Sequence, residues 1–138
     1  MGNMETIKTI IDTDLLIDLL RNQKQATAFI AMLEEKNYVL ATTVINIFEL
    51  HFGAHKSEES EKNLQAINIL ISRLSILPLT SKAAQKAGHL YAQLEQQGQP
   101  IGLRDTLIAA IAMTREFSVA TRNQGHFKRI SGVEIITP

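Results

Sequence analysis

Three carboxylates stand out in this sequence because their neighbours are apolar. Asp12 lies in TIIDTDLLI, Glu49 in VINIFELHF and Asp105 in IGLRDTLIAAIAM. Taken singly, each acid has an ordinary explanation, since an acid after a strand often caps the next helix and one in a first helical turn favours the helix dipole. A helical glutamate is usually solvated on the polar face. The case for chemistry therefore depends on whether the three acids lie together.

Three converging carboxylates would have a definite chemistry. Two like charges about 4 Å apart repel by about 4 kcal/mol at an effective dielectric constant near 20, so a cation must lie among them or their pKa values must rise. The chain has no cysteine, and a ligand set made only of oxygens suits a hard cation such as Mg²⁺ or Mn²⁺. Such an ion acidifies a bound water and holds a phosphate, which predicts metal-assisted hydrolysis of a phosphodiester bond.

The elements that must position these acids alternate along the chain. Short β-branched or apolar segments predict strands at 6–11, 38–41, 75–79, 118–121 and 133–136. Apolar periodicity and capping residues predict helices at 15–20, 24–36, 44–54, 57–73, 81–97 and 104–115, with a short helix or turn at 125–130. This alternation predicts a three-layer α/β fold with a mainly parallel central sheet flanked by helices. Ligands of such sheets bind beyond the carboxyl ends of the strands, where residues after different strands can meet.

Composition limits the classes of protein that remain. A chain of 138 residues with 45% hydrophobic residues suits one domain. Its 14 basic and 14 acidic residues sum to zero, which excludes a polycationic coat for nucleic acid or membrane. The lack of cysteine excludes disulfides, thiolate metal sites and cysteine nucleophiles, and favours the cytoplasm. We expect a single domain over 1–138, with no export signal or membrane span, whose first five residues, including Met1-Gly2-Asn3, are disordered.

The sequence resembles the PIN-domain ribonucleases and, among them, the VapC toxins of type II toxin–antitoxin systems. The resemblance covers nearly the whole chain and rests on IIDTDLLIDLL, TTVINIFELHFGA, PIGLRDTLIAAIAM and VATRNQGHFKRISGVEIITP. It implies a PIN-like fold and a divalent-metal-dependent endoribonuclease that acts as a toxin. It also implies a homodimer and a cognate antitoxin protein that inhibits the enzyme.

The resemblance also assigns roles to individual residues. The three metal-binding acids of the family match Asp12, Glu49 and Asp105. Family members often carry a further acid after the last strand, in a Thr-x-Asp or Thr-x-Asn context, and this chain has Thr121-Arg122-Asn123 there. Asn123 adds no charge, which leaves open whether a second metal binds, although its carbonyl can accept from a metal-bound water that Thr121 orients. Asp14 is interpreted chiefly as a helix cap with a supporting role.

An acidic cleft that admits RNA needs cations nearby to offset the phosphate charge. From residue 101 onward the chain has five basic and three acidic residues, a local balance of +2. We expect Arg104 and Arg122, which neighbour the proposed ligands, to hold phosphates. Lys128 and Arg129 are equally compatible with an ordinary solvated surface.

Rival classes of enzyme fit the same residues less well. Asp12-Thr13-Asp14 is similar to the DxD motif of haloacid-dehalogenase-type phosphatases, but that motif requires Thr or Val where this chain has Leu16. A response-regulator receiver needs a phosphorylatable aspartate after a central strand, and neither YVLATT nor SILPLT supplies one. A non-catalytic PIN-like module that binds RNA or protein stays open, because Asn123 leaves the acid set incomplete.

The four histidines have structural interpretations at this point. His51 and His55 lie four residues apart beside Glu49, but a zincin motif needs glutamate at Phe52, so both are expected to be surface or packing residues. We expect His89 to be half-buried in its helix. His126, in GHFKR, is expected to pack or cap rather than catalyse.

Overall fold

The computed structural model describes residues 6–138. Its sheet contains β1 (Lys8–Ile11), β2 (Val39–Thr43), β3 (Ser75–Leu77), β4 (Ser118–Ala120) and β5 (Ile135–Ile136). The helices are α1 (Thr13–Leu20), α2 (Lys24–Glu35), α3 (Val44–Lys56), α4 (Ser60–Ile71), α5 (Ser81–Gln96), α6 (Leu103–Arg115) and the short 3₁₀ helix η1 (Phe127–Arg129). The predicted alternation is therefore confirmed, whereas the expected disorder of residues 1–5 lies outside the described part of the chain.

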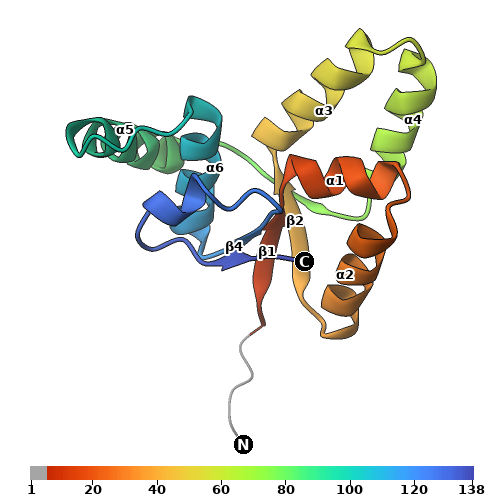
Figure 1. Cartoon of the computed structure of the whole chain (residues 1–138), viewed down its shortest axis with the longest axis horizontal. Helices are drawn as coiled ribbons and strands as arrows, with labels where there is room; N and C mark the ends of the chain where they lie inside the picture. Colours follow the sequence, from red (N-terminus) through yellow and green to blue (C-terminus); the bar gives the residue numbers. More distant parts are fainter. Residues whose placement is uncertain (1–5) are drawn as a thin grey trace, which may run out of the picture.

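The strands form one sheet in the order β3-β2-β1-β4-β5, and all neighbouring pairs run parallel. Ile10 of the central strand pairs with Ala41 on one side and Val119 on the other. Parallel strands end at the same edge, so the segments after β1, β2 and β4 are neighbours in space although they are far apart in sequence. Figure 1 shows α1 and α3 starting at this edge.

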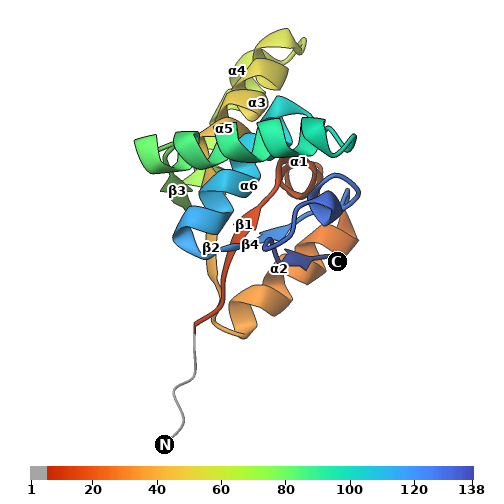
Figure 2. The same ribbon diagram turned by 90° about the vertical axis from the view of Figure 1, so that its left-hand side faces the viewer.

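Helices cover both faces of the sheet. Successive residues of a strand point to opposite faces, and Ile10 and Ile11 accordingly belong to different buried clusters. Ile10 packs with α5 and α6, whereas Ile11 packs with residues of α1 to α4. Figures 1 and 2 show these two helix groups on either side of the strands, which confirms the three-layer architecture. No helix of residues 6–138 combines the length and the apolarity that a membrane crossing requires.

Two helix starts are fixed by side-chain caps at the carboxyl edge of the sheet. The Thr43 hydroxyl accepts hydrogen bonds from the backbone nitrogens of Ile45, at 3.1 Å, and Asn46, at 3.3 Å. Asn46 returns the interaction, since its Oδ1 accepts from the backbone nitrogen of Thr43 at 3.2 Å. This capping box fixes the direction in which α3 leaves β2. Asp12 caps α1 by accepting from the Thr13 backbone nitrogen at 2.8 Å.

Candidate active site

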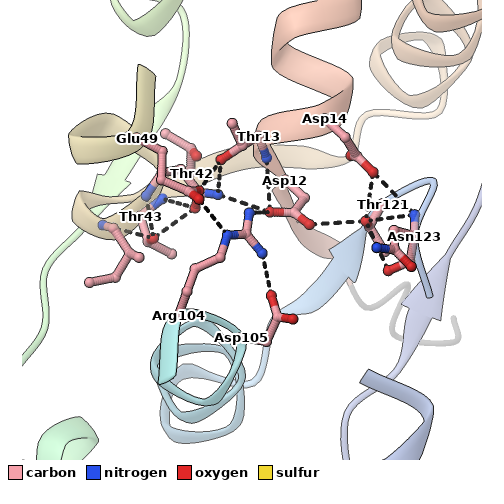
Figure 3. A network of polar contacts seen from close by, with 12 residues as sticks. Asp12, Thr13, Asp14, Thr42, Thr43, Glu49, Arg104, Asp105, Thr121 and Asn123 are labelled. Carbon is pink, nitrogen blue, oxygen red and sulfur yellow. Dashed lines mark hydrogen bonds and ion pairs between the residues drawn. The ribbon is translucent and has the colours of Figure 1, made fainter. Parts of the chain in front are cut away.

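The three predicted acids come together at the carboxyl edge of the sheet. Asp12 follows β1, Glu49 lies in the second turn of α3, and Asp105 lies in the first turn of α6. Figure 3 shows them around the side chain of Arg104. They border an open cleft of about 640 Å³. Its lining consists of Asp12, Thr13, Asp14, Ile17, Glu49, Arg104, Asp105, Arg122, Asn123 and His126.

Arg104 lies at the centre of the acids. Its Nη2 is 2.5 Å from Asp12 Oδ1, its Nε is 2.7 Å from Glu49 Oε2, and its Nη1 donates to Asp105 Oδ1. Burial opposes the charge on this guanidinium, but the hydrogen bond with Glu49 and the charge of Asp12 outweigh it and raise the pKa of Arg104. One positive charge is thus shared by three carboxylates, which leaves the cleft negative when all three are ionised.

Asp12 is the most enclosed of the acids, with 3% of its surface exposed. Burial raises the pKa of its carboxyl group, and the nearby charge and hydrogen bond of Arg104 oppose that rise. Its Oδ1 accepts from the Asn46 side chain at 3.0 Å, and its Oδ2 accepts from the Thr121 hydroxyl at 2.9 Å. A carboxylate held from this many directions is fixed in orientation, as a metal ligand must be.

Asn46 is a site residue that the sequence interpretation missed. It is fully buried, and its Nδ2 donates to Asp12 Oδ1 at 3.0 Å and to the Thr13 hydroxyl at 2.9 Å. Thr13 in turn donates to Glu49 Oε1 at 2.6 Å, so the chain of hydrogen bonds joins two of the acids. The available signal was a lone asparagine in an apolar helix, three residues after Thr43 and three before Glu49.

Replacing Asn46 with alanine is expected to lower the free energy of unfolding by about 1–3 kcal/mol, because buried partners lose their hydrogen bonds. Urea denaturation followed by circular dichroism would measure the change. Asn68→Ala is the matched control, since Asn68 is exposed on α4. Equal losses in the two variants would contradict the assigned role of Asn46.

Asp14 holds the loop that follows β4 and does not cap α1. Its Oδ2 accepts from the backbone nitrogens of Arg122, at 3.0 Å, and Asn123, at 3.1 Å. The interpretation of Asp14 as chiefly a helix cap was therefore wrong, because Asp12 occupies the cap position. The Thr121 hydroxyl lies between the acids, 2.9 Å from Asp12 Oδ2 and 3.2 Å from Asp14 Oδ2, and its single hydrogen can serve only one of them at a time. Figure 3 shows this arrangement.

His126 belongs to the site rather than to the core. Its Nδ1 lies 2.7 Å from Asp105 Oδ2 and its side chain is 47% exposed in the cleft wall. It precedes η1 but makes no side-chain cap, so the expectation of packing or capping was wrong. His89 is exposed, which corrects its expected half-burial, whereas His51 is half-buried and contacts the backbone oxygen of Ile47 at 2.9 Å.

The basic residues near the cleft are engaged to different degrees. Arg122 is 54% exposed and its Nε is 2.9 Å from Asp18 Oδ2, so it stays at the cleft rim. Arg129 is exposed and donates to the backbone oxygen of Pro100 at 2.8 Å, and Lys128 is exposed as well. The phosphate-holding roles of Arg104 and Arg122 stay predictions, and Arg104 can take that role only after it leaves the acids.

The donor set fits a hard divalent cation in its chemistry. The oxygens of Asp12, Glu49 and Asp105 each contact a different nitrogen of one guanidinium, so the three carboxylates surround one cationic group. Within residues 6–138, no group of three acidic or histidine side chains is arranged to ligate an ion as the side chains stand. Arg104 occupies the space among the three acids, so an ion could bind them together only after the guanidinium moves.

A parallel α/β domain with an acidic cleft at the carboxyl edge of its sheet agrees with the fold and the site expected of the PIN class. The PIN domain family model matches residues 9–133. The chain belongs to the PIN domain family and, within it, to the VapC ribonucleases. It is 33% identical over 129 residues to the tRNA(fMet)-specific endonuclease VapC of Salmonella typhimurium, covering 94% of this chain and 96% of that protein.

Further relatives and solved structures agree with this family assignment. Ribonuclease VapC2 of Rickettsia felis is 32% identical over 121 residues, covering 88% of this chain and 90% of that protein. The structure of VapBC2 from Rickettsia felis, bound to a DNA fragment from its promoter, matches with a TM-score of 0.88 at 28% identity, covering 96% of this chain and 99% of that chain. DNA-bound VapBC from Salmonella typhimurium matches with a TM-score of 0.85 at 32% identity, covering 96% of this chain and 98% of that chain.

Proposed function

We propose that this protein is a Mg²⁺- or Mn²⁺-dependent endoribonuclease and the toxin of a toxin–antitoxin pair. The observation that carries the proposal is the gathering of Asp12, Glu49 and Asp105 around one cationic group, the Arg104 guanidinium, in an open cleft. The relatives that match nearly the whole chain are ribonucleases, which supports RNA as the substrate. RNA as substrate also favours the cytoplasm as the site of action.

The chain's own residues prepare this cleft for phosphodiester hydrolysis. Asp12, Glu49 and Asp105 would hold the divalent ion, which when bound supplies an acidified water and charge stabilisation at the phosphate. Asn46 and Thr13 fix the orientation of two of these acids through their hydrogen bonds.

The loop after β4 contributes the second set of groups. The Thr121 hydroxyl is buried between Asp12 and Asp14 and helps to fix these two acids, so it does not reach a water in the cleft as expected. The side-chain carbonyl of Asn123, which lines the cleft, can accept from such a water. Asn123 brings no charge, so these residues favour one ion over two. Arg122 at the rim is placed to contact an RNA phosphate.

The experiment that tests the proposal is cleavage of a mixed RNA pool by the purified chain, with Mg²⁺ or Mn²⁺ and with excess EDTA. We expect cleavage with either metal and its loss in EDTA, followed by recovery when metal is restored. Cleavage that is unchanged in EDTA would contradict the metal mechanism. RNA binding without cleavage under every metal condition would favour the alternative, a non-catalytic PIN-like binding module. The uncharged side chain of Asn123, which leaves the acid set incomplete, is the observation that supports this alternative.

We infer that a second copy of the chain covers an apolar patch on α3, defined by Val44, Phe48 and Phe52. Phe48 is 68% exposed and Phe52 is 55% exposed, and their rings stack with centroids 6.2 Å apart. Val44, one turn before Phe48, adds further exposed apolar surface, with 38% exposure. Phenylalanines exposed one turn apart are typical of an interface.

A separate groove supports the proposed antitoxin partner. It lies between α1, α3 and α4, and apolar side chains form much of its wall. These are Ile17, Leu20, Leu50, Ala54 and Ile67. A structurally similar protein from Mycobacterium tuberculosis is a member of the VapBC family of toxin–antitoxin systems. We propose that an apolar segment of a cognate antitoxin binds this chain in the groove. Glu49 also lines the groove, so a segment bound there would adjoin the acidic cleft.

A further inference from the structure

The position of Arg104 conflicts with that of a divalent ion. Its three guanidinium nitrogens contact Asp12, Glu49 and Asp105 separately, so the oxygens that would ligate the ion already have a cationic partner. An ion at the same point would be repelled by the guanidinium twice as strongly as a single charge would be. The arginine and the ion therefore compete for one set of oxygens.

The guanidinium of Arg104 is also able to move away from the three acids. This residue lies in the first turn of α6 beside Asp105, and its side chain is 33% exposed, so rotation about its own side-chain bonds can carry the guanidinium toward solvent. The acids, in contrast, are held by other partners that do not depend on Arg104, including Asn46 and Thr121 for Asp12 and Thr13 for Glu49. Asp12 and Glu49 thus keep hydrogen-bond partners when Arg104 leaves, and the three carboxylates would close around the ion that replaces it.

We propose that Arg104 is a built-in competitor of the catalytic metal: it neutralises the three acids when no ion is bound and must withdraw before the ion binds. The inference rests on the proposed function, because it takes these acids as the metal ligands. It has two consequences. Arg104 weakens the affinity for the ion, and it stabilises the metal-free fold by offsetting the repulsion among the carboxylates.

The test compares Mn²⁺ binding and thermal stability in the intact chain and in Arg104→Met, without RNA. Methionine keeps an apolar stem of similar reach and removes the charge. Isothermal titration calorimetry should show at least tenfold tighter Mn²⁺ binding by Arg104→Met than by the wild type. In EDTA the variant should melt at a lower temperature than the wild type, and saturating Mn²⁺ should raise its Tm by more.

Two further variants make the outcomes distinct. Arg115→Met alters an exposed arginine at the other end of α6 and should bind Mn²⁺ as the wild type does. Arg104→Lys keeps a charge but cannot contact three acids in the same way, so it should fold without metal and bind Mn²⁺ with intermediate affinity. Equal affinities in the wild type and both Arg104 variants would overturn the competition while leaving the metal mechanism intact. Absence of Mn²⁺ binding in every variant would overturn the proposed function and this inference together.

Discussion

Replacing Asp105 with asparagine is expected to lower the rate of RNA cleavage by about 100-fold or more, the magnitude typical of removing one charge-stabilising group from a preorganised site. Asparagine has nearly the same size but cannot carry the negative charge that faces the cation position. Loss of this charge weakens ion binding and removes the anionic partner of His126 at 2.7 Å. The measurement is the initial rate of cleavage at saturating Mg²⁺, with growth arrest on expression as a second readout.

The control for this variant is Glu95→Gln, which removes an exposed carboxylate on α5 that does not line the cleft. It should cleave RNA at the wild-type rate. The Asp105 variant should stay folded, because a neutral amide relieves part of the repulsion among the acids, and circular dichroism would verify this. A folded Asp105→Asn protein with wild-type cleavage would contradict the assigned role of Asp105.

Replacing Phe48 with aspartate is expected to raise the dissociation constant of the homodimer by at least about 30-fold, since loss of an aromatic interface anchor costs about 2 kcal/mol or more. The charge also opposes burial against a second copy. Phe48 is 68% exposed in the single chain, so the free energy of unfolding of the monomer should change little. Light scattering after size-exclusion chromatography over a range of concentrations would measure the shift.

Ile69→Asp provides the comparison, because Ile69 is 65% exposed but lies on α4, outside the Phe48 and Phe52 patch. It should leave the oligomeric state unchanged. A dimer that survives in Phe48→Asp, or that dissociates equally in both variants, would assign the interface to another surface.

Local patterns in the sequence were enough to predict the elements and the layer architecture. Periodicity and capping residues located each helix, and the structure shows Thr43 as the cap of α3. The strand predicted at 75–79 is shorter, ending at Leu77, because Pro78 has no backbone N–H to donate to a neighbouring strand. The order of the strands in the sheet could not be predicted, since it depends on contacts between distant segments.

The site was predictable in its acids but not in its contacts. The convergence of the three acids followed from their positions after strands and at helix starts. The partners of Asp12 are 34 residues away in Asn46, 92 in Arg104 and 109 in Thr121, and no local pattern reports such pairings. The orientation of the Arg104 side chain could not be predicted either, because an arginine beside an acid can face the solvent, a phosphate or the acid itself.

The central position of β1 also has a consequence for how the proposed site assembles. The strand that ends before Asp12 pairs with β4, and the Asp12 carboxylate is held by Thr121, 109 residues further along the chain. A polypeptide that ends before residue 121 lacks this support, and one that ends before residue 105 lacks one of the three acids. The proposed ligand set is therefore complete only when the segment that contains β4 has been synthesised and has paired with β1.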